Sequence, residues 1–318
     1  METLALGHKI DFAVIISVHG ANPNGDPLNG NRPRINYDGY GEISDVCIKR
    51  KIRNRLMEAE HKIFVQSDDN RVDAHRSLSA RFDAFLDSNP KVKETMKKDD
   101  HLLRDAACKE WTDVRAFGQV FAYKGKSKGK SKSETDNKQD EKADAGGVSI
   151  GIRGPVSIHS AFSVTSVHSN VSSIQITKSV SGEGDGTKKA SDTMGMKHRV
   201  DHGLYVSYGA INPNLAEKTL FSDADADAIH EALKHLLDND ESSARPAGTM
   251  EIIAVLWWKH NSKHGQYPSA VVHRSLNVEP KKGIDNPKKI EDYSIRYKKL
   301  DGLEPKIFNP NKVSIESF

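Results

Sequence analysis

The sequence predicts an α+β fold whose elements follow the order strand, helix, strand, strand, helix, strand. Three observations support this order. Every second residue from Ile10 to Val18 is apolar, a basic amphipathic helix pattern begins at Asp45, and a nearly unbroken apolar run extends from Met250 to Trp258. The order βαββαβ is the split βαβ arrangement of the ferredoxin-like and RNA-recognition-motif folds.

The first strand and the segment after it are typical of a phosphate-binding element. The alternation from Ile10 to Val18 is the period of a strand that places one face on a core. A turn-rich stretch, 21–27, follows. We expect Gly25 to adopt a positive φ and to leave backbone amides open, and the N-terminus of the next helix to add partial positive charge.

The helix that begins at Asp45 has two distinct faces. On a helical wheel one stripe is apolar and a second face is basic. The apolar stripe contains Ile48, Ile52, Leu56 and Ala59, and the basic face contains Lys49, Arg50 and Arg53. This helix can pack on a core and still present cations to solvent. A solvated basic face without a ligand is the alternative.

The middle of the chain reads as helices and then strands. Residues 77–86 and 101–111 have helical patterns, and Val114 to Tyr123 resembles a strand. From Lys124 to Gly147 lysine, serine, glycine and acids alternate without a hydrophobic pattern, which predicts a disordered loop.

The second half predicts a long hairpin, a helix and a buried strand. Segments 156–166, 171–180 and 204–211 are strand-like, and a glycine-rich, basic tip interrupts them. Ser222 with Asp225 forms an N-cap signature before the apolar stripe 229–237. We expect the remainder, with Val271-Val272, Ile295 and Ile307, to form short edge strands.

Composition excludes several classes of protein. The 318 residues carry a net charge of +3 with two cysteines, too few for a disulfide scaffold, which suits a reducing cytoplasm. The longest N-terminal apolar run, 12–16, is too short for a signal sequence or a membrane span. Basic residues gather at 47–55 and 124–133, and acids gather at 223–227 and 238–241. Positive potential is therefore expected on particular faces.

A series of short motifs follows along the chain. In order, they are Asn-Pro-Asn-Gly-Asp-Pro (22–27), Gly-Asn-Arg-Pro-Arg-Ile (30–35), 45–54, Asp-Val-Arg-Ala-Phe-Gly (113–118), Arg-Gly-Pro-Val (153–156), Thr-Met-Gly-Met-Lys-His (193–198) and Tyr205. These motifs and their order resemble the CRISPR-associated backbone subunit of type I-C Cascade (RAMP superfamily, Csd-type). The resemblance covers about Ile10 to Trp258.

The resemblance implies one elaborated domain, 1–318, shaped like a hand. A modified RNA-recognition-motif core would be the palm. Residues 61–112 would form an inserted helical fingers or web region, 124–147 a loop, and 164–206 a long thumb hairpin. The implied function is a non-catalytic subunit that polymerises head to tail along a CRISPR RNA and presents it for pairing with a target DNA strand.

Candidate site residues follow from the needs of guide binding, because a guide gripped by its phosphates keeps its bases free. The first group is Asn22, Asn24, Arg32, Arg34, Lys49, Arg50 and Arg53. The asparagines of this group are equally suited to forming turns, and its arginines could instead pair with acids of a neighbouring copy.

Two further groups complete the candidates. Arg115 and Phe117 lie two apart on an expected strand, so they would share a face and clamp a phosphate and a base, or else serve the core. Thr193, Met194, Lys197 and His198 resemble the segment that crosses the guide, with Met194 as a wedge between bases or as a contact to the next subunit.

Two rival functions remain. By analogy with type III backbone subunits, Asp45 or Asp26 could cleave RNA with a metal, although the first turn of a helix explains Asp45 as well. His198 and His202 have zincin spacing without the glutamate, so we expect no metal site there. The resemblance to type I backbone subunits, which delegate cutting to a recruited nuclease, implies no enzyme activity, and we expect no cofactor. The second rival is a monomeric RNA-recognition module, which the scarcity of aromatic RNA-binding motifs disfavours.

The implied partners belong to an antiviral complex in the cytoplasm. They are the CRISPR RNA, the target DNA strand, further copies of the chain, guide-processing, large and small Cascade subunits, and a recruited helicase-nuclease. No membrane partner is expected.

Overall fold

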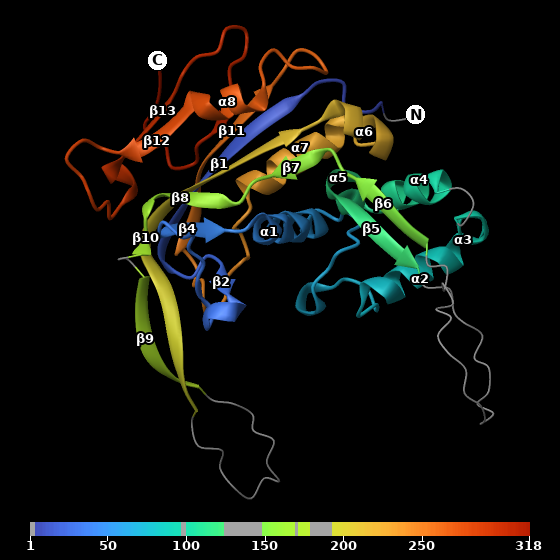
Figure 1. Cartoon of the computed structure of the whole chain (residues 1–318), viewed down its shortest axis with the longest axis horizontal. Coiled ribbons are helices and arrows are strands. Elements are labelled where there is room, and N and C mark those ends of the chain that lie inside the picture. Colours follow the sequence, from blue (N-terminus) through green and yellow to red (C-terminus); the bar gives the residue numbers. More distant parts are fainter. Residues whose placement is uncertain (1–3, 97–99, 124–147, 169–170, 179–192) are drawn as a thin grey trace, which may run out of the picture.

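The computed structural model describes residues 4–96, 100–123, 148–168, 171–178 and 193–318 (Figure 1). It confirms the mixed α+β class. The expected loop 124–147 and most of the hairpin tip, 179–192, lie outside the described residues. No helix among the described residues is long and apolar enough to cross a membrane.

A large antiparallel sheet forms the centre of the molecule, in the order β14-β11-β1-β10-β8-β4. The long strand β10 pairs along its length with β9, β8 and β7 in turn. The strands of this sheet are β1 (Ile10–Ala21), β4 (Tyr40–Ile43), β7 (Val156–Ile158), β8 (Ala161–Ser166), β9 (Val171–Lys178), β10 (Thr193–Ile211), β11 (Met250–Lys259) and β14 (Lys306–Phe308).

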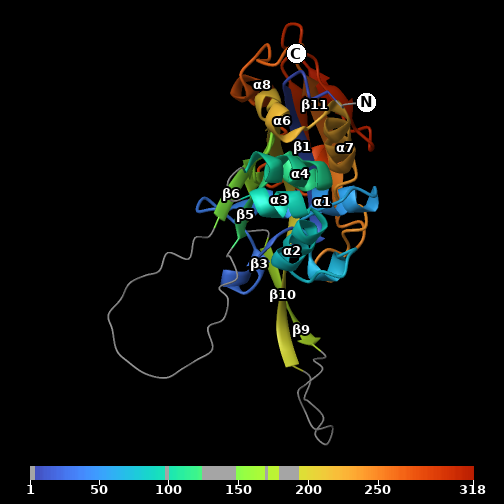
Figure 2. The ribbon, with the colours of Figure 1, turned by 90° about the vertical axis from the view of Figure 1, so that its right-hand side faces the viewer.

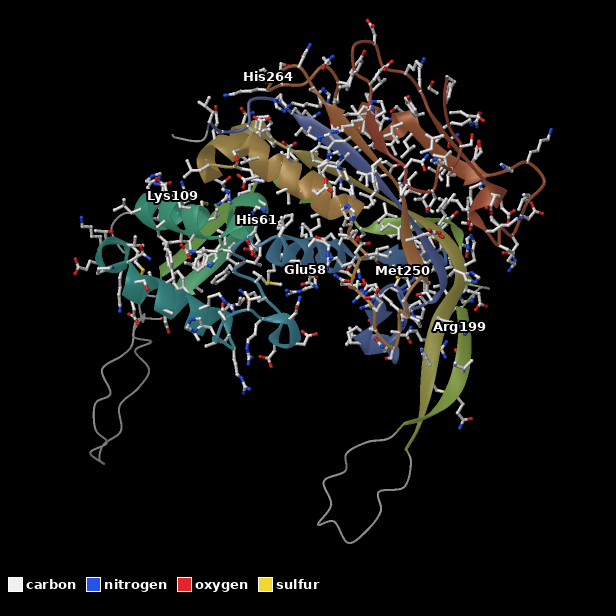
Figure 3. The ribbon with its side chains drawn as sticks, turned by 180° about the vertical axis from the view of Figure 1, so that it is seen from behind. Glu58, His61, Lys109, Arg199, Met250 and His264 are labelled. Carbon is white, nitrogen blue, oxygen red and sulfur yellow. The ribbon has the colours of Figure 1, made fainter. Side chains whose placement is uncertain are left out.

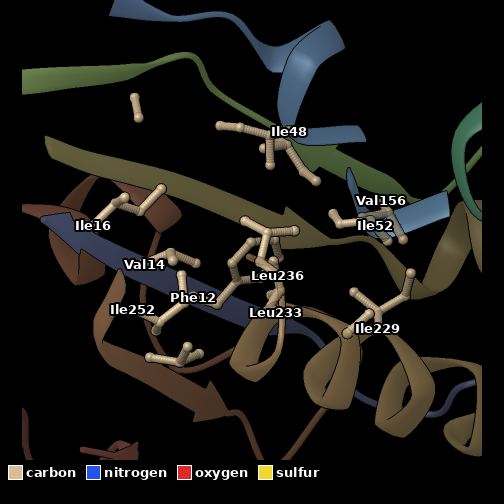
Figure 4. Packing of buried hydrophobic residues seen from close by; sticks show 14 of the residues in the cluster. Phe12, Val14, Ile16, Ile48, Ile52, Val156, Ile229, Leu233, Leu236 and Ile252 are labelled. Carbon is tan, nitrogen blue, oxygen red and sulfur yellow. The ribbon is translucent and has the colours of Figure 1, made fainter. Parts of the chain in front are cut away.

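Two long helices, α1 (Asp45–Glu58) and α7 (Asp223–Lys234), cover one face of this sheet. Figure 4 shows Phe12 and Val14 of β1 against Ile48 and Ile52 of α1 and Leu233 of α7. Each fully buried aliphatic side chain here stabilises the fold by roughly 1.5–3 kcal/mol. Both helices begin where the sequence predicts them, and Ser222 and Asp225 form the expected capping box, but α7 ends at Lys234, before the end of the expected stripe 229–237. Ala59, placed on the apolar stripe, is instead exposed at the end of α1.

The opposite face of the sheet is buried as well, which corrects the expectation that β1 has a single buried face. Ala13 and Ile15 of β1 are fully buried beneath a C-terminal layer. Helix α8 (Ser269–Ser275) and a second sheet cover this face (Figure 1). That sheet consists of β12 (Leu276–Pro280), β13 (Tyr293–Tyr297) and β15 (Ile315–Ser317). Val271 and Val272, expected in a strand, therefore lie in α8.

A helical region with its own core follows α1. It contains α2 (Leu78–Ser88), α3 (Pro90–Thr95), α4 (His101–Glu110) and α5 (Thr112–Phe117), with the hairpin β5 (Gly118–Tyr123) and β6 (Val148–Arg153). Phe64, Phe82, Trp111 and Phe121 gather in its core. The expected strand 114–123 is wrong in its first part, because residues up to Phe117 continue a helix.

The hairpin of β9 and β10 extends away from the body of the molecule (Figures 1 and 2). Residues 171–178 pair with 193–200, whereas Tyr205 and Val206 pair with β8 in the main sheet. The segment 156–166, expected as one strand, is divided into β7 and β8. Two short elements, β2 (Gly25–Asp26) and β3 (Arg32–Pro33), form a small ribbon, and α6 (Pro213–Thr219) follows β10.

Candidate nucleic-acid interface

The two asparagines of the first loop hold the loop itself together. Asn22 is buried, and its Nδ2 donates to the carbonyl oxygen of Asn31 at 2.8 Å. The Oδ1 of Asn24 accepts from the backbone nitrogen of Ser44 at 2.9 Å and from its hydroxyl at 2.8 Å. The structure therefore shows them as loop-forming residues that tie the loop to the start of α1.

The loop does not form the expected phosphate cradle at a helix N-terminus. Gly25 lies in β2 without a positive φ, and a Cβ there would come within 2.0 Å of the Asn31 side chain. Gly30 and Asn31 adopt the left-handed conformation instead. Two amides of the first turn of α1 already have partners, because the backbone nitrogens of Asp45 and Cys47 donate to the hydroxyls of Ser160 and Ser44.

The two arginines of the loop differ in their freedom. Arg32 is exposed and forms no ion pair with any described residue. Arg34 lies 3.8 Å from Asp26 Oδ1, and its buried Nε has no hydrogen-bond partner among the described residues. Arg32 is thus available to a ligand, and Arg34 is partly engaged.

The basic face of α1 is turned largely toward its own protein. Lys49 Nζ pairs with Asp45 Oδ2 at 2.9 Å, and Arg50 Nη1 donates to the carbonyl oxygen of Val65 at 2.9 Å. Arg53 Nε lies 2.8 Å from the fully buried Asp113 Oδ2. The contacts of Arg50 and Arg53 fasten α1 to the helical region, whereas the Lys49 pair lies within α1.

Arg115 and Phe117 do not form a shared clamp, because they lie in α5 and not on a strand. Arg115 pairs with Asp225 at 2.7 Å and bridges to α7. Phe117 is partly buried against the main core, and the guanidinium that lies over its ring, at 5.1 Å, belongs to Arg53. Helical periodicity separates residues two apart on the helix surface.

The base of the β9–β10 hairpin carries cations on one of its two faces. Successive strand residues point to opposite sides, so Lys197 and Arg199 share a face while Met196 and His198 share the other. Lys197 forms no ion pair with a described residue. Arg199, labelled in Figure 3, is 43% exposed and lies 3.4 Å from Asp201 Oδ1. The side chains of Thr193 and Met194 lie outside the described residues.

His198 joins the two strands of the hairpin and lies near Arg32 of the first loop. Its Nδ1 is 2.7 Å from the Ser173 hydroxyl, and the ring is buried. Burial lowers the pKa of His198, and the charge of Arg32 lowers it further. Because β3 packs beside β10, Arg32 lies close to the hairpin base. The lowered pKa disfavours a second positive charge beside Arg32.

The candidate surface therefore consists of Arg32, Arg34, Lys197 and Arg199, which we call the loop–hairpin surface. The sequence predictions missed Arg199. Its signal was the run Lys-His-Arg at 197–199, in which strand alternation places the first and third cations together.

Comparison with known proteins adds a family. The family described as CRISPR-associated protein Cas7 matches residues 8–298. The chain belongs to the Cas7 family. A Cas7 relative, the CRISPR-associated protein Cas7 of Haloferax volcanii, is 26% identical over 242 residues, which is 76% of this chain and 67% of that protein.

Two solved structures are similar to this Cas7-family chain. One, named CRISPR RNA-guided surveillance complex, pre-nicking, covers 79% of this chain and 78% of its own, with 14% identity and a TM-score of 0.40. The other, named CRISPR RNA-guided surveillance complex, covers 98% of this chain and 94% of its own, with 15% identity and a TM-score of 0.42.

The carboxylates considered for catalysis have ion-pair or hydrogen-bond partners within the chain. Asp45 pairs with Lys49, and Asp26 Oδ1 accepts from the backbone nitrogen of Leu28. His198 and His202 lie in β10, where four residues span roughly 13 Å. Among the described residues no group of three or more His, Cys, Asp or Glu side chains is placed to hold a metal ion.

Proposed function

We propose that this chain is the non-catalytic, CRISPR RNA-binding backbone subunit of a type I-C Cascade surveillance complex. Its copies would polymerise head to tail along one guide and present it for pairing with a target DNA strand. Membership of the Cas7 family supports the general assignment. The ordered motifs between Asn22 and Tyr205 support the type I-C assignment.

The observation that carries the proposal is the position of Arg32 beside the base of a projecting hairpin. Arg32 and Lys197 keep their charged ends free of described acids, although several other candidate cations are paired. An RNA strand that passes the first loop and bends around the hairpin can contact Arg32, Lys197 and Arg199 in succession. Cations at the edge of such a path grip phosphates and leave bases available.

The buried faces of the main sheet support phosphate gripping over base stacking. In an RNA-recognition motif the open sheet face carries the aromatic side chains that stack on bases. Here that face is covered, because Ala13, Leu204 and Trp258 lie under the C-terminal layer. This arrangement disfavours a monomeric RNA-recognition module.

The fold also suits the hand-shaped architecture that we propose. In space the strands of the βαββαβ core follow the order β11-β1-β10-β7/β8, all antiparallel, and this order supports a ferredoxin-like palm. The helical region would be the fingers or web, and the β9–β10 hairpin the thumb. Further partners would be guide-processing, large and small subunits and a recruited helicase-nuclease, all in the cytoplasm.

The decisive experiment replaces Arg32, Lys197 and Arg199 together by alanine in the full chain. We expect the variant to retain guide RNA less well and to show a salt dependence shallower by about 2 in the slope of log affinity against log salt, since each lost single-strand phosphate contact removes about 0.7. Lys282→Ala, an exposed cation of the C-terminal layer, is the matched control. An unchanged slope in the triple variant would remove the loop–hairpin surface from guide binding.

A further inference from the structure

A second basic site lies apart from the loop–hairpin surface, in a hollow between α4, β6 and α6. The hollow has a volume of about 250 Å³. Arg104 of α4, Arg153 of β6 and Lys218 of α6 line it, together with Gly151, Ile152, Leu215 and Thr219. Three cations from three separate parts of the sequence therefore meet at one place.

The charges of the hollow are poorly compensated. No acidic residue lines it. Arg104 Nη2 lies 3.5 Å from Asp100 Oδ2, a partly exposed pair, and neither Arg153 nor Lys218 forms an ion pair with a described residue. Glu217 could have balanced Lys218, but it pairs with Lys263. Like charges gathered in this way repel one another unless an anion lies between them.

The shape and chemistry of the hollow fit a phosphate of an extended chain. Arg153 and Lys218 are exposed, and a Cβ on Gly151 would meet nothing within 4 Å, so a backbone can approach closely. The lining contains no aromatic side chain on which a base could stack. Arginine and lysine side chains without aromatic neighbours bind phosphodiesters with little preference for sequence.

We infer that this hollow binds the phosphodiester backbone of a second polynucleotide strand, distinct from the strand held at the loop–hairpin surface. The inference rests on the proposed function in that a guide occupies the loop–hairpin surface. In Figures 1 and 2, α4 and α6 lie in the body of the molecule, away from the projecting hairpin. One chain can thus contact two strands at two separate faces.

The test uses the full chain loaded with a guide that cannot pair with thymine, titrated with fluorescein-labelled oligo(dT). We expect replacement of Arg104, Arg153 and Lys218 together by alanine to weaken oligo(dT) binding about tenfold at low salt and to make the salt slope shallower by about 2. Guide retention, measured in the same samples, stays unchanged. Lys109→Ala, an exposed cation of α4 outside the hollow (Figure 3), leaves both values unchanged.

Three results would overturn the inference. Unaltered oligo(dT) affinity in the triple variant would show that the hollow binds no strand. Equal loss of guide and oligo(dT) would assign the hollow to the guide path. A changed mass of the assembly with unchanged oligo(dT) affinity would make it a contact with an acidic protein surface. Failure of the unaltered chain to retain guide would contradict the proposed function. It would not decide the inference about the hollow, which the oligo(dT) titration tests separately.

Discussion

Arg53 of α1 and Asp113 at the start of α5 form a buried ion pair, with Nε 2.8 Å from Oδ2. The same carboxylate accepts from the backbone nitrogens of Phe64 and Val65, at 2.7 and 3.1 Å. Asp113 is fully buried, so its charge depends on these partners. The pair joins the main core to the helical region. Arg53 therefore has a structural role, although its position in a basic run suggested an exposed cation.

Replacing Arg53 by alanine is expected to destabilise the chain by roughly 3 kcal/mol, because the variant leaves Asp113 buried with fewer partners. Urea unfolding of the full chain measures the change. Lys49→Ala is the control, since it removes only a partly exposed pair with Asp45, worth about 0.3–0.5 kcal/mol. Equal stability of the two variants would show that the Arg53 pair contributes nothing beyond a surface contact.

Arg32→Ala is expected to have the opposite profile. The side chain is exposed and forms no ion pair with a described residue, so the free energy of unfolding should change by less than about 0.5 kcal/mol. Guide retention should fall in Arg32→Ala. Arg53→Ala, in contrast, should act mainly by lowering the stability of the fold. Unfolding and guide retention measured on both variants check this separation, and a large loss of stability in Arg32→Ala would contradict it.

Acid should weaken the contact between β1 and the segment after β11. Asp11 Oδ2 lies 2.8 Å from His260 Nε2 and 3.1 Å from Lys9 Nζ, and both Asp11 and His260 are buried. Burial raises the pKa of Asp11, but hydrogen bonds from His260 and Ser269 and the charge of Lys9 outweigh it, so the pKa lies below its ordinary value.

This carboxylate therefore contributes stability above its unfolded pKa of 3.8, and the contribution is lost as pH falls through the lower folded value. Unfolding measured from pH 5 downward should show a decline that is smaller in Asp11→Asn. An identical pH dependence in the two proteins would mean that Asp11 has the same pKa in both states.

His230 should make the chain less stable in mild acid. Its ring stacks on Trp257 at 4.5 Å, and its buried Nε2 has no hydrogen-bond partner among the described residues. Burial lowers the pKa of His230 to about 4 from 6.5, and the charges of Lys234 and Lys306 add to this. Between these values the unfolded chain binds more protons, so the free energy of unfolding falls as pH decreases.

His230→Phe keeps a ring against Trp257 and removes the titration. The loss of stability between pH 7 and pH 5 should be smaller in this variant than in the unaltered chain. Burial also lowers the pKa of His202 and His273. Both residues remain in the two proteins, so the difference in pH dependence between the proteins reports on His230. A steeper loss of stability between pH 7 and pH 5 in the variant would contradict a lowered pKa of His230.

The guide-bound chain is expected not to cleave complementary RNA with or without magnesium, because Asp45 already pairs with Lys49 and Asp26 caps Leu28. Single-turnover assays with labelled RNA measure this. Magnesium-dependent cleavage that Asp45→Asn or Asp26→Asn abolishes would replace the proposed function by that of an RNA-cleaving subunit.

Much of the fold could be predicted because its signals are local. The alternation in β1, the stripe and cap of α7 and the apolar run of β11 each fit within about twelve residues. The failures occur where two elements compete. The sequence predicts a strand at 114–117, but these residues lie in helix α5, where Val114 packs into the core of the helical region. Val271 and Val272 are β-branched, yet they fold into a short helix over the main sheet.

The sequence by itself determined the order of the core strands and helices, the membership of the family and the existence of basic clusters, since these are properties of neighbouring residues and of motif order. Only the tertiary structure decided which cations remain free. Arg53 finds Asp113 at a separation of 60 residues, and Arg115 finds Asp225 at 110. Arg32 meets no such described acid. A cation's availability depends on which carboxylate the folded chain brings within a few ångströms, and no local pattern records that distance.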